Sequence, residues 1–103
     1  MFKEVLEIDA ADPVATMGLG TAYMQLESYA EAVPYLEQAV ESKKDFSAAF
    51  LNLGKCHEFL GANAAAVKAY EAGIAAAGRK GDLMPLREME RRLEALRTAE
   101  GSN

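Results

Sequence analysis

The chain has 103 residues, the size of one small domain or of part of a larger one. Half of the residues are hydrophobic and tryptophan is absent, a composition typical of a helical protein and not of a strand-rich one. Sixteen acidic residues against eleven basic ones give a net charge of -5, so nucleic acid and membrane surfaces are not expected as partners. The same acidity is consistent with a basic partner, with solubility alone, or with a salt-adapted source.

Cysteine usage and hydropathy restrict the cellular setting. Cys56 is the single cysteine, which excludes an internal disulfide and a cysteine-based metal site and fits a reducing, cytoplasmic location. No apolar run reaches the roughly 20 residues that a membrane helix needs. The opening MFKEVLEIDAADP lacks the apolar core of a signal peptide.

Apolar periodicity and turn signals predict two pairs of helices, at residues 13–26 and 29–42 and at residues 47–60 and 63–77. Helices joined by only two or three residues must lie antiparallel. Ser28 followed by Glu31 predicts a capping box at the start of the second helix, and the turn from Gly61 to Asn63 is its counterpart in the second pair. Pro34 removes a backbone donor inside the second helix, so a later start or a bend is expected there.

The second pair of helices repeats the first. A shift of 34 residues superimposes identical residues throughout: Ala15 on Ala49, Leu19 on Leu53, Gly20 on Gly54, Leu26 on Leu60, Ala32 on Ala66 and Glu37 on Glu71. Self-similarity at a fixed period of this size predicts a solenoid of stacked helix pairs.

Two glycines inside the first helix of each pair need an explanation, because glycine costs a helix roughly 1 kcal/mol relative to alanine. We predict that Gly20 faces Ala32 and that Gly54 faces Ala66, so that two helix axes approach closely. Larger apolar residues then fill the layers around this contact: Leu19, Leu26, Leu36 and Val40 in one pair and Leu53, Leu60, Tyr70 and Ile74 in the other.

The pattern resembles the tetratricopeptide repeat (TPR), whose signature is a large residue, Leu-Gly and Tyr in helix A, and Ala, an aromatic residue and Ala in helix B. The matching positions are Thr16, Leu19, Gly20, Tyr23, Tyr29, Ala32, Leu36 and Ala39, then Phe50, Leu53, Gly54, His57, Ala66, Tyr70 and Gly73. Lys44 and Gly78 replace the closing proline, and Thr16 and His57 replace bulkier aromatic residues. The resemblance implies an all-α fold, a right-handed α-solenoid of antiparallel helix pairs.

In this register the chain is one domain with two complete repeats, at 13–46 and 47–80. Residues 1–12, with Phe2 and Val5 in the helix-B register, are expected to end a preceding repeat, so that the natural array extends further towards the N-terminus. Residues 81–98 are expected to form a capping helix with a charged outer face, and 99–103 a tail. The expected N-cap of the capping helix is Asp82, and the apolar stripe of this helix is Leu86, Met89, Leu93 and Leu96.

No residues suggest catalysis, a cofactor or a metal, so the chain is not expected to be an enzyme. Cys56 and His57 are adjacent on a helix and point about 100 degrees apart, so they are expected to pack between helices. The carboxylates of the last helix lie among arginines at helical spacing, a pattern typical of surface pairing.

The resemblance implies a binding groove on the concave face formed by the A helices. The positions that it assigns to this groove are Met17, Thr21, Met24 and Gln25 in the first repeat and Leu51, Asn52, Lys55, Glu58 and Phe59 in the second. This mixture of apolar and polar residues suits an extended peptide or a helix. Alternatively, Met17, Leu51 and Phe59 bury against neighbouring helices.

The function expected is therefore a non-catalytic module that binds a peptide or partner protein in the concave groove. One subgroup of the family clamps a C-terminal carboxylate, but Met17 and Thr21 replace its first Lys and Asn, and only Asn52 fits. The alternative is a structural spacer or self-association segment of a larger protein, forming a weak homo-oligomer through the exposed ends of the solenoid.

Overall fold

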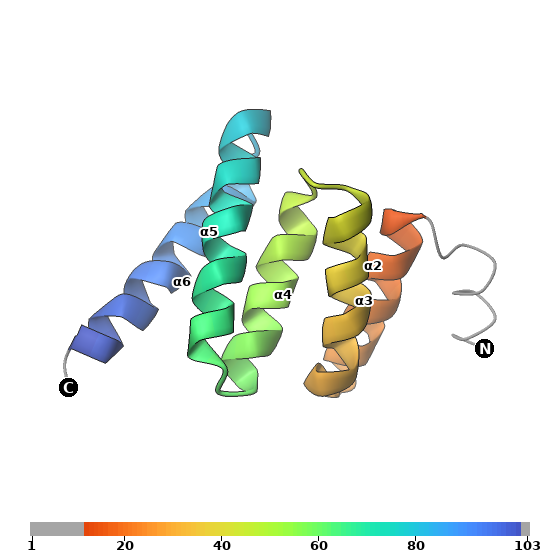
Figure 1. The fold of residues 1–103 in the computed structure, drawn as a ribbon, viewed down its shortest axis with the longest axis horizontal. Coiled ribbons are helices and arrows are strands. Elements are labelled where there is room, and N and C mark those ends of the chain that lie inside the picture. Colours follow the sequence, from red (N-terminus) through yellow and green to blue (C-terminus); the bar gives the residue numbers. More distant parts are fainter. Residues whose placement is uncertain (1–11, 102–103) are drawn as a thin grey trace.

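The computed structural model describes residues 12–101, so the repeat predicted before residue 12 and the end of the tail lie outside the described residues. The described chain is all α-helical, and Figure 1 shows its helices side by side in chain order. The helices are α2 (Pro13–Gln25), α3 (Tyr29–Ser42), α4 (Ser47–Phe59), α5 (Asn63–Lys80) and α6 (Leu83–Gly101). The predicted α-solenoid is confirmed.

Local sequence explains most helix ends. Asp12 caps α2, where its carboxylate accepts a hydrogen bond from the amide of Val14 at 3.0 Å and Pro13 occupies the first turn. The predicted end of α5 at residue 77 is wrong, because α5 continues to Lys80. Gly81, whose φ is 75°, then terminates the helix in the left-handed conformation.

The turn between α2 and α3 differs from the prediction. Ser28 precedes α3, but its side chain makes no capping hydrogen bond, so the predicted capping box with Glu31 is wrong. Backbone bonds hold this turn instead: the amide of Ser28 donates to the carbonyl of Tyr23 at 2.8 Å, after Glu27 with φ of 60°. Pro34 lies within a continuous α3, so the helix does not begin after it.

The two packing glycines face larger residues than predicted. A Cβ on Gly20 would lie 2.7 Å from Cγ of Leu36, and its contact with Ala32 would be to the carbonyl oxygen, at 3.4 Å. A Cβ on Gly54 would lie 2.6 Å from both Cδ1 and Cζ of Tyr70. The prediction that the glycines face alanine side chains is therefore wrong: each accommodates the large residue one turn further along helix B.

Two buried clusters form the core. The first consists of Ala32, Leu36, Leu53, Cys56 and Ala69, and the second of Ala66, Tyr70, Ala77, Met89 and Leu93. Because α5 contributes to both clusters, and partly buried residues of α2 and α4 pack against the first and the second respectively, the stack is continuous from α2 to α6. Met89 and Leu93 are the buried residues of α6, as its predicted apolar stripe requires, while Leu86 and Leu96 are partly buried.

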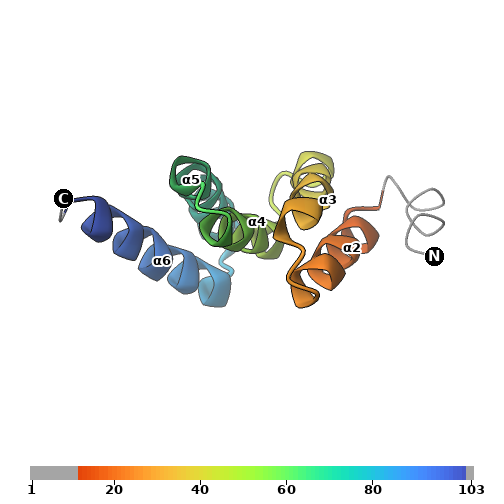
Figure 2. The same cartoon turned by 90° about the horizontal axis from the view of Figure 1, so that it is seen from below.

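The helices form two layers that define two faces. Figure 2 shows α2, α4 and α6 along one side and α3 and α5 along the other. In that view α4 is set back between α2 and α6, so the side made by these three helices is concave. The connections from α2 to α3 and from α4 to α5 lie at the same edge of the stack (Figure 1).

Candidate functional site

The predicted groove residues lie on α2 and α4, the first two helices of the concave layer (Figure 2). Gln25 and Phe59 are exposed, and Phe59 retains 60% of its accessible surface. The other predicted residues are partly buried: Met17, Thr21, Met24, Leu51, Asn52, Lys55 and Glu58. Most of the set therefore shares its surface between neighbouring helices and solvent.

The apolar members belong partly to the core. Met17 and Met24 pack against the first buried cluster, and Leu51 packs against the second. For Met17 and Leu51 the alternative of burial against neighbouring helices is thus correct in part. Phe59 instead stacks on Tyr29, with ring centroids 4.4 Å apart and planes 11° apart, which fixes an exposed aromatic surface where α4 ends.

Glu58 is held in a polar network that joins three helices. Its carboxylate accepts a hydrogen bond from the hydroxyl of Tyr70 on α5 and lies 3.4 Å from a guanidinium nitrogen of Arg92 on α6. Arg92 Nε also donates to Glu88 at 3.1 Å. The same carboxylate thus serves α5 and α6, and Glu58 is a fixed, charge-paired part of the concave face.

The network also perturbs the groups that form it. Burial, reinforced by the hydrogen bond to Glu58, raises the pKa of Tyr70 above its ordinary value, so the phenol remains a neutral donor. Burial alone would lower the pKa of Arg92, but the hydrogen bond to Glu88 and the adjacent charges raise it overall. Arg92 is therefore a permanent cation at this junction.

Sequence reasoning missed Arg92 and the hydroxyl of Tyr70 as parts of the concave face. The sequence signal that could have indicated this contact is that Glu58 and Arg92 carry opposite charges and lie 34 residues apart, which is one repeat period. Arg92 and Glu88 were expected to pair on the surface, and they do pair; the additional contact of Arg92 with α4 is the new observation.

Two polar residues of α4 remain available for a ligand. Asn52 and Lys55 are partly exposed, and within residues 12–101 their side chains enter no ion pair and no side-chain hydrogen bond that the structure shows. An amide both donates and accepts hydrogen bonds, and an ammonium group donates three. Together they can hold a peptide backbone and an acidic group.

The adjacent Cys56 and His57 form no common site. Cys56 is fully buried, and burial raises the pKa of its thiol to about 11, which makes it a poor nucleophile. His57 instead lines a surface cavity with Phe50 and Lys68. No group of three His, Cys, Asp or Glu side chains in the described residues could hold a metal ion. None of the described helices is both long and apolar enough to cross a membrane.

Antiparallel helix pairs with a 34-residue period, packed into one layer of A helices and one of B helices, define a helical-repeat protein. A family model described as tetratricopeptide repeat matches residues 17–81. The TPR repeat-containing protein PA0015 of Pseudomonas aeruginosa is 34% identical over 84 residues, which are 79% of this chain and 80% of that protein. The chain belongs to the tetratricopeptide repeat family.

Solved structures agree with this assignment. The solution structure of protein BPP2914 from Bordetella parapertussis matches with a TM-score of 0.81 and 26% identity, over 100% of this chain and 92% of that one. The TPR2B domain of yeast Sti1, in a complex with pHsp70, matches with a TM-score of 0.85 over 95% of this chain and 78% of that chain. At 16% identity, the likeness to Sti1 shows the fold alone. TPR folds are in general non-catalytic and mediate contacts between proteins.

Proposed function

We propose that this chain is a non-catalytic module that binds an extended peptide segment of a partner protein along the concave face of α2, α4 and α6. The observation that supports this most strongly is the surface of α4. It combines the partly exposed Asn52 and Lys55 with the exposed, stacked ring of Phe59. Polar groups that fix a peptide backbone beside an aromatic anchor are typical of peptide-recognition surfaces.

Each residue has a distinct role in this proposal. Asn52 holds the peptide backbone through its amide, and Lys55 attracts an acidic group of the ligand. Phe59, supported by Tyr29, contacts an apolar side chain. Glu58 does not bind the ligand directly, because its carboxylate is occupied by Tyr70 and Arg92; it fixes the wall of the groove.

The ligand in this proposal is recognised through its middle rather than through its C-terminus. The Sti1 domain is seen in a complex with pHsp70, and that fold likeness supports a protein or peptide partner. Met17 and Thr21, however, are an apolar and a neutral side chain at the positions where a carboxylate clamp would have Lys and Asn. A peptide with an amidated C-terminus is therefore expected to bind as well as one with a free carboxylate.

The test is to pan a random peptide library against the full chain and against an Asn52→Ala, Lys55→Ala, Phe59→Ala variant. The control is a Glu41→Ala, Lys44→Ala, Arg79→Ala variant, which changes residues away from the A helices. Peptides that bind the wild type and the control but do not bind the groove variant support the proposal. Equal binding to all three, or no enrichment at all, overturns it.

Self-association remains the second candidate, because apolar side chains are exposed at the start of α6. Leu83 and Met84 retain 55% and 84% of their accessible surface. Such residues can pair with a second copy of the chain. Light scattering at several concentrations separates the candidates: a mass that stays at 11.1 kDa eliminates self-association, and a mass that rises with concentration supports it. A cytoplasmic location is also proposed, supported by the single, buried, reduced cysteine.

A further inference from the structure

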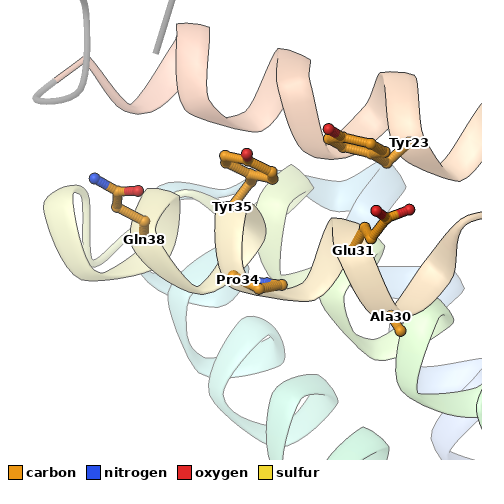
Figure 3. Close-up of a pocket in the computed structure, with 6 residues that line it drawn as sticks. All are labelled: Tyr23, Ala30, Glu31, Pro34, Tyr35 and Gln38. Atoms are coloured by element: carbon orange, nitrogen blue, oxygen red, sulfur yellow. The ribbon is translucent and has the colours of Figure 1, made fainter. Parts of the chain in front are cut away.

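A surface cavity lies between α2 and α3. Most of its lining comes from α3, which belongs to the layer opposite the concave groove. The volume of the cavity is about 510 Å³. Figure 3 shows the rings of Tyr23 from α2 and Tyr35 from α3 side by side, with the Glu31 carboxylate on the same side of α3. Among the described residues the lining is Tyr23, Ala30, Glu31, Pro34, Tyr35 and Gln38.

The same place in the second repeat is also a cavity, of about 280 Å³. Its lining includes the residues that lie 34 positions after five residues of the first cavity: His57, Ala65, Lys68, Ala69 and Ala72. The hollow is therefore a recurring feature of the helix pair. Its chemistry changes between repeats, because Ala65 and Ala69 stand where the first repeat has Glu31 and Tyr35.

The two hollows also differ in how deeply their residues are buried. Ala69 belongs to the first buried cluster, whereas Tyr35, at the same position of the first repeat, is only partly buried. Glu31 is exposed and Tyr35 only partly buried, so neither is a core residue. An exposed carboxylate beside two tyrosine rings in a surface hollow offers a ligand both charge and aromatic surface.

The chemistry of the lining selects a cation. Tyr23 and Tyr35 stack with centroids 5.5 Å apart and planes 7° apart, which presents an aromatic surface four residues from Glu31 on α3. Burial, followed by the neighbouring Tyr35 and Glu31, raises the pKa of Tyr23, so its phenol stays neutral. No cationic side chain of the described residues lines this cavity, and Glu31 enters no ion pair that the structure shows among them.

We propose that this cavity is a second binding site, which takes an arginine side chain from a basic segment of a partner protein. The planar guanidinium stacks on the tyrosine rings and donates to the carboxylate of Glu31. The net charge of -5 attracts such a segment at long range. The site is independent of the concave groove, because it is formed by α3 and the end of α2 and by none of the proposed groove residues.

The test is a two-dimensional NMR titration of the isotope-labelled full chain with the peptide acetyl-Gly-Arg-Gly-amide, and with acetyl-Gly-Gln-Gly-amide as the uncharged probe. The work is done at about 0.15 M salt, where charges more than about 8 Å apart are screened. The arginine peptide is expected to shift the amide signals of Tyr23, of residues 30–33 and of residues 35–38, and the glutamine peptide is not. Equal shifts with both peptides, or shifts concentrated elsewhere, overturn the proposal.

Variants make the test specific. Glu31→Gln and Tyr35→Ala should each weaken binding roughly two- to fivefold, the usual range for one exposed cation–π or charge contact. Tyr35 is only partly buried and belongs to neither buried cluster, so the fold should survive Tyr35→Ala. Glu41→Gln removes the same charge from another exposed position of α3 and should leave binding unchanged.

The outcomes also distinguish this site from the proposed groove. The Asn52→Ala, Lys55→Ala, Phe59→Ala variant should bind the arginine peptide as the wild type does, whether or not it binds panned peptides. Equal weakening by Glu31→Gln and Glu41→Gln would mean general charge attraction and would overturn the site. Binding only after removal of residues 1–11 would mean that the chain itself occupies the cavity, which also overturns it.

Discussion

Substitution of Gly54 by alanine tests the close contact on which the second repeat depends. The added Cβ would lie 2.6 Å from Cδ1 and Cζ of Tyr70, a ring that is fully buried and whose hydroxyl is bonded to Glu58. Because the ring is rigid and held at both ends, it cannot move aside cheaply. Overpacking of this kind costs about 1 to 3 kcal/mol, against a helix-propensity gain of about 1 kcal/mol.

A matched glycine isolates the packing contribution. Gly78 also lies inside a helix and is exposed, and a Cβ added to it would meet no atom within 4 Å, so Gly78→Ala gains helix propensity without overpacking. The difference in unfolding free energy between the two variants is therefore the overpacking cost, about 1 to 3 kcal/mol in favour of Gly78→Ala. Urea unfolding followed by far-UV circular dichroism measures it, provided that both curves share one slope. If Gly54→Ala is as stable as Gly78→Ala, the close contact with Tyr70 is absent and the reasoning is refuted.

Three further predictions address the core, the network and the thiol. Leu53→Ala should cost about 2 to 5 kcal/mol of unfolding free energy, since Leu53 is only 7% exposed; a near-zero change in urea unfolding contradicts its placement. A double-mutant cycle of Glu58→Gln and Arg92→Met should give a coupling of about 0.5 to 1 kcal/mol, limited because these side chains are 26% and 31% exposed; zero coupling contradicts the pair. Burial raises the pKa of the Cys56 thiol from 9.0 to about 11, so between these pH values the folded state keeps a proton that the unfolded chain loses, and the free energy of unfolding should fall as the pH rises. The urea midpoint of Cys56→Ala should fall less steeply with pH than that of the wild type. Equal slopes for the two proteins contradict the assignment.

The helix pairs could be predicted because several local signals agree. The period, the Leu-Gly pair and the helix-B alanine all indicate the same register, and α3 occupies the residues that this register predicts. The glycine contacts were less predictable. Sequence shows that Gly20 needs a close neighbour, but only the crossing of α2 and α3 decides that this neighbour is Leu36.

The capping box failed for a similar reason. Ser28 and Glu31 have the right spacing, but Glu27 adopts a positive φ and the turn satisfies its amides through the backbone. A spacing rule identifies a capacity for a hydrogen bond and not the conformation that permits it.

The network at Arg92 was missed because an arginine on the last helix normally indicates solvent. Arg92 instead contacts α4, where its guanidinium lies 3.4 Å from the carboxylate of Glu58, which neutralises it. Opposite charges one period apart were visible in the sequence, but their contact depends on how α6 packs.

The surface differences from one repeat to the other are the least predictable part of the molecule. The two cavities arise from the same positions, yet their lining differs because Glu31 and Tyr35 are replaced by Ala65 and Ala69. Such differences have no periodic signature, since periodicity reports only what the repeats share. They become informative once the structure shows that both sets of residues line the same hollow.

The most direct test of the proposed function is to titrate the strongest panned peptide into the isotope-labelled chain and to map the amide signals that change. The account predicts that the changes concentrate on α4 around Asn52, Lys55 and Phe59, and that an amidated C-terminus does not alter the affinity. Changes confined to α3 and α5, with α4 unaffected, would contradict peptide binding in the concave groove.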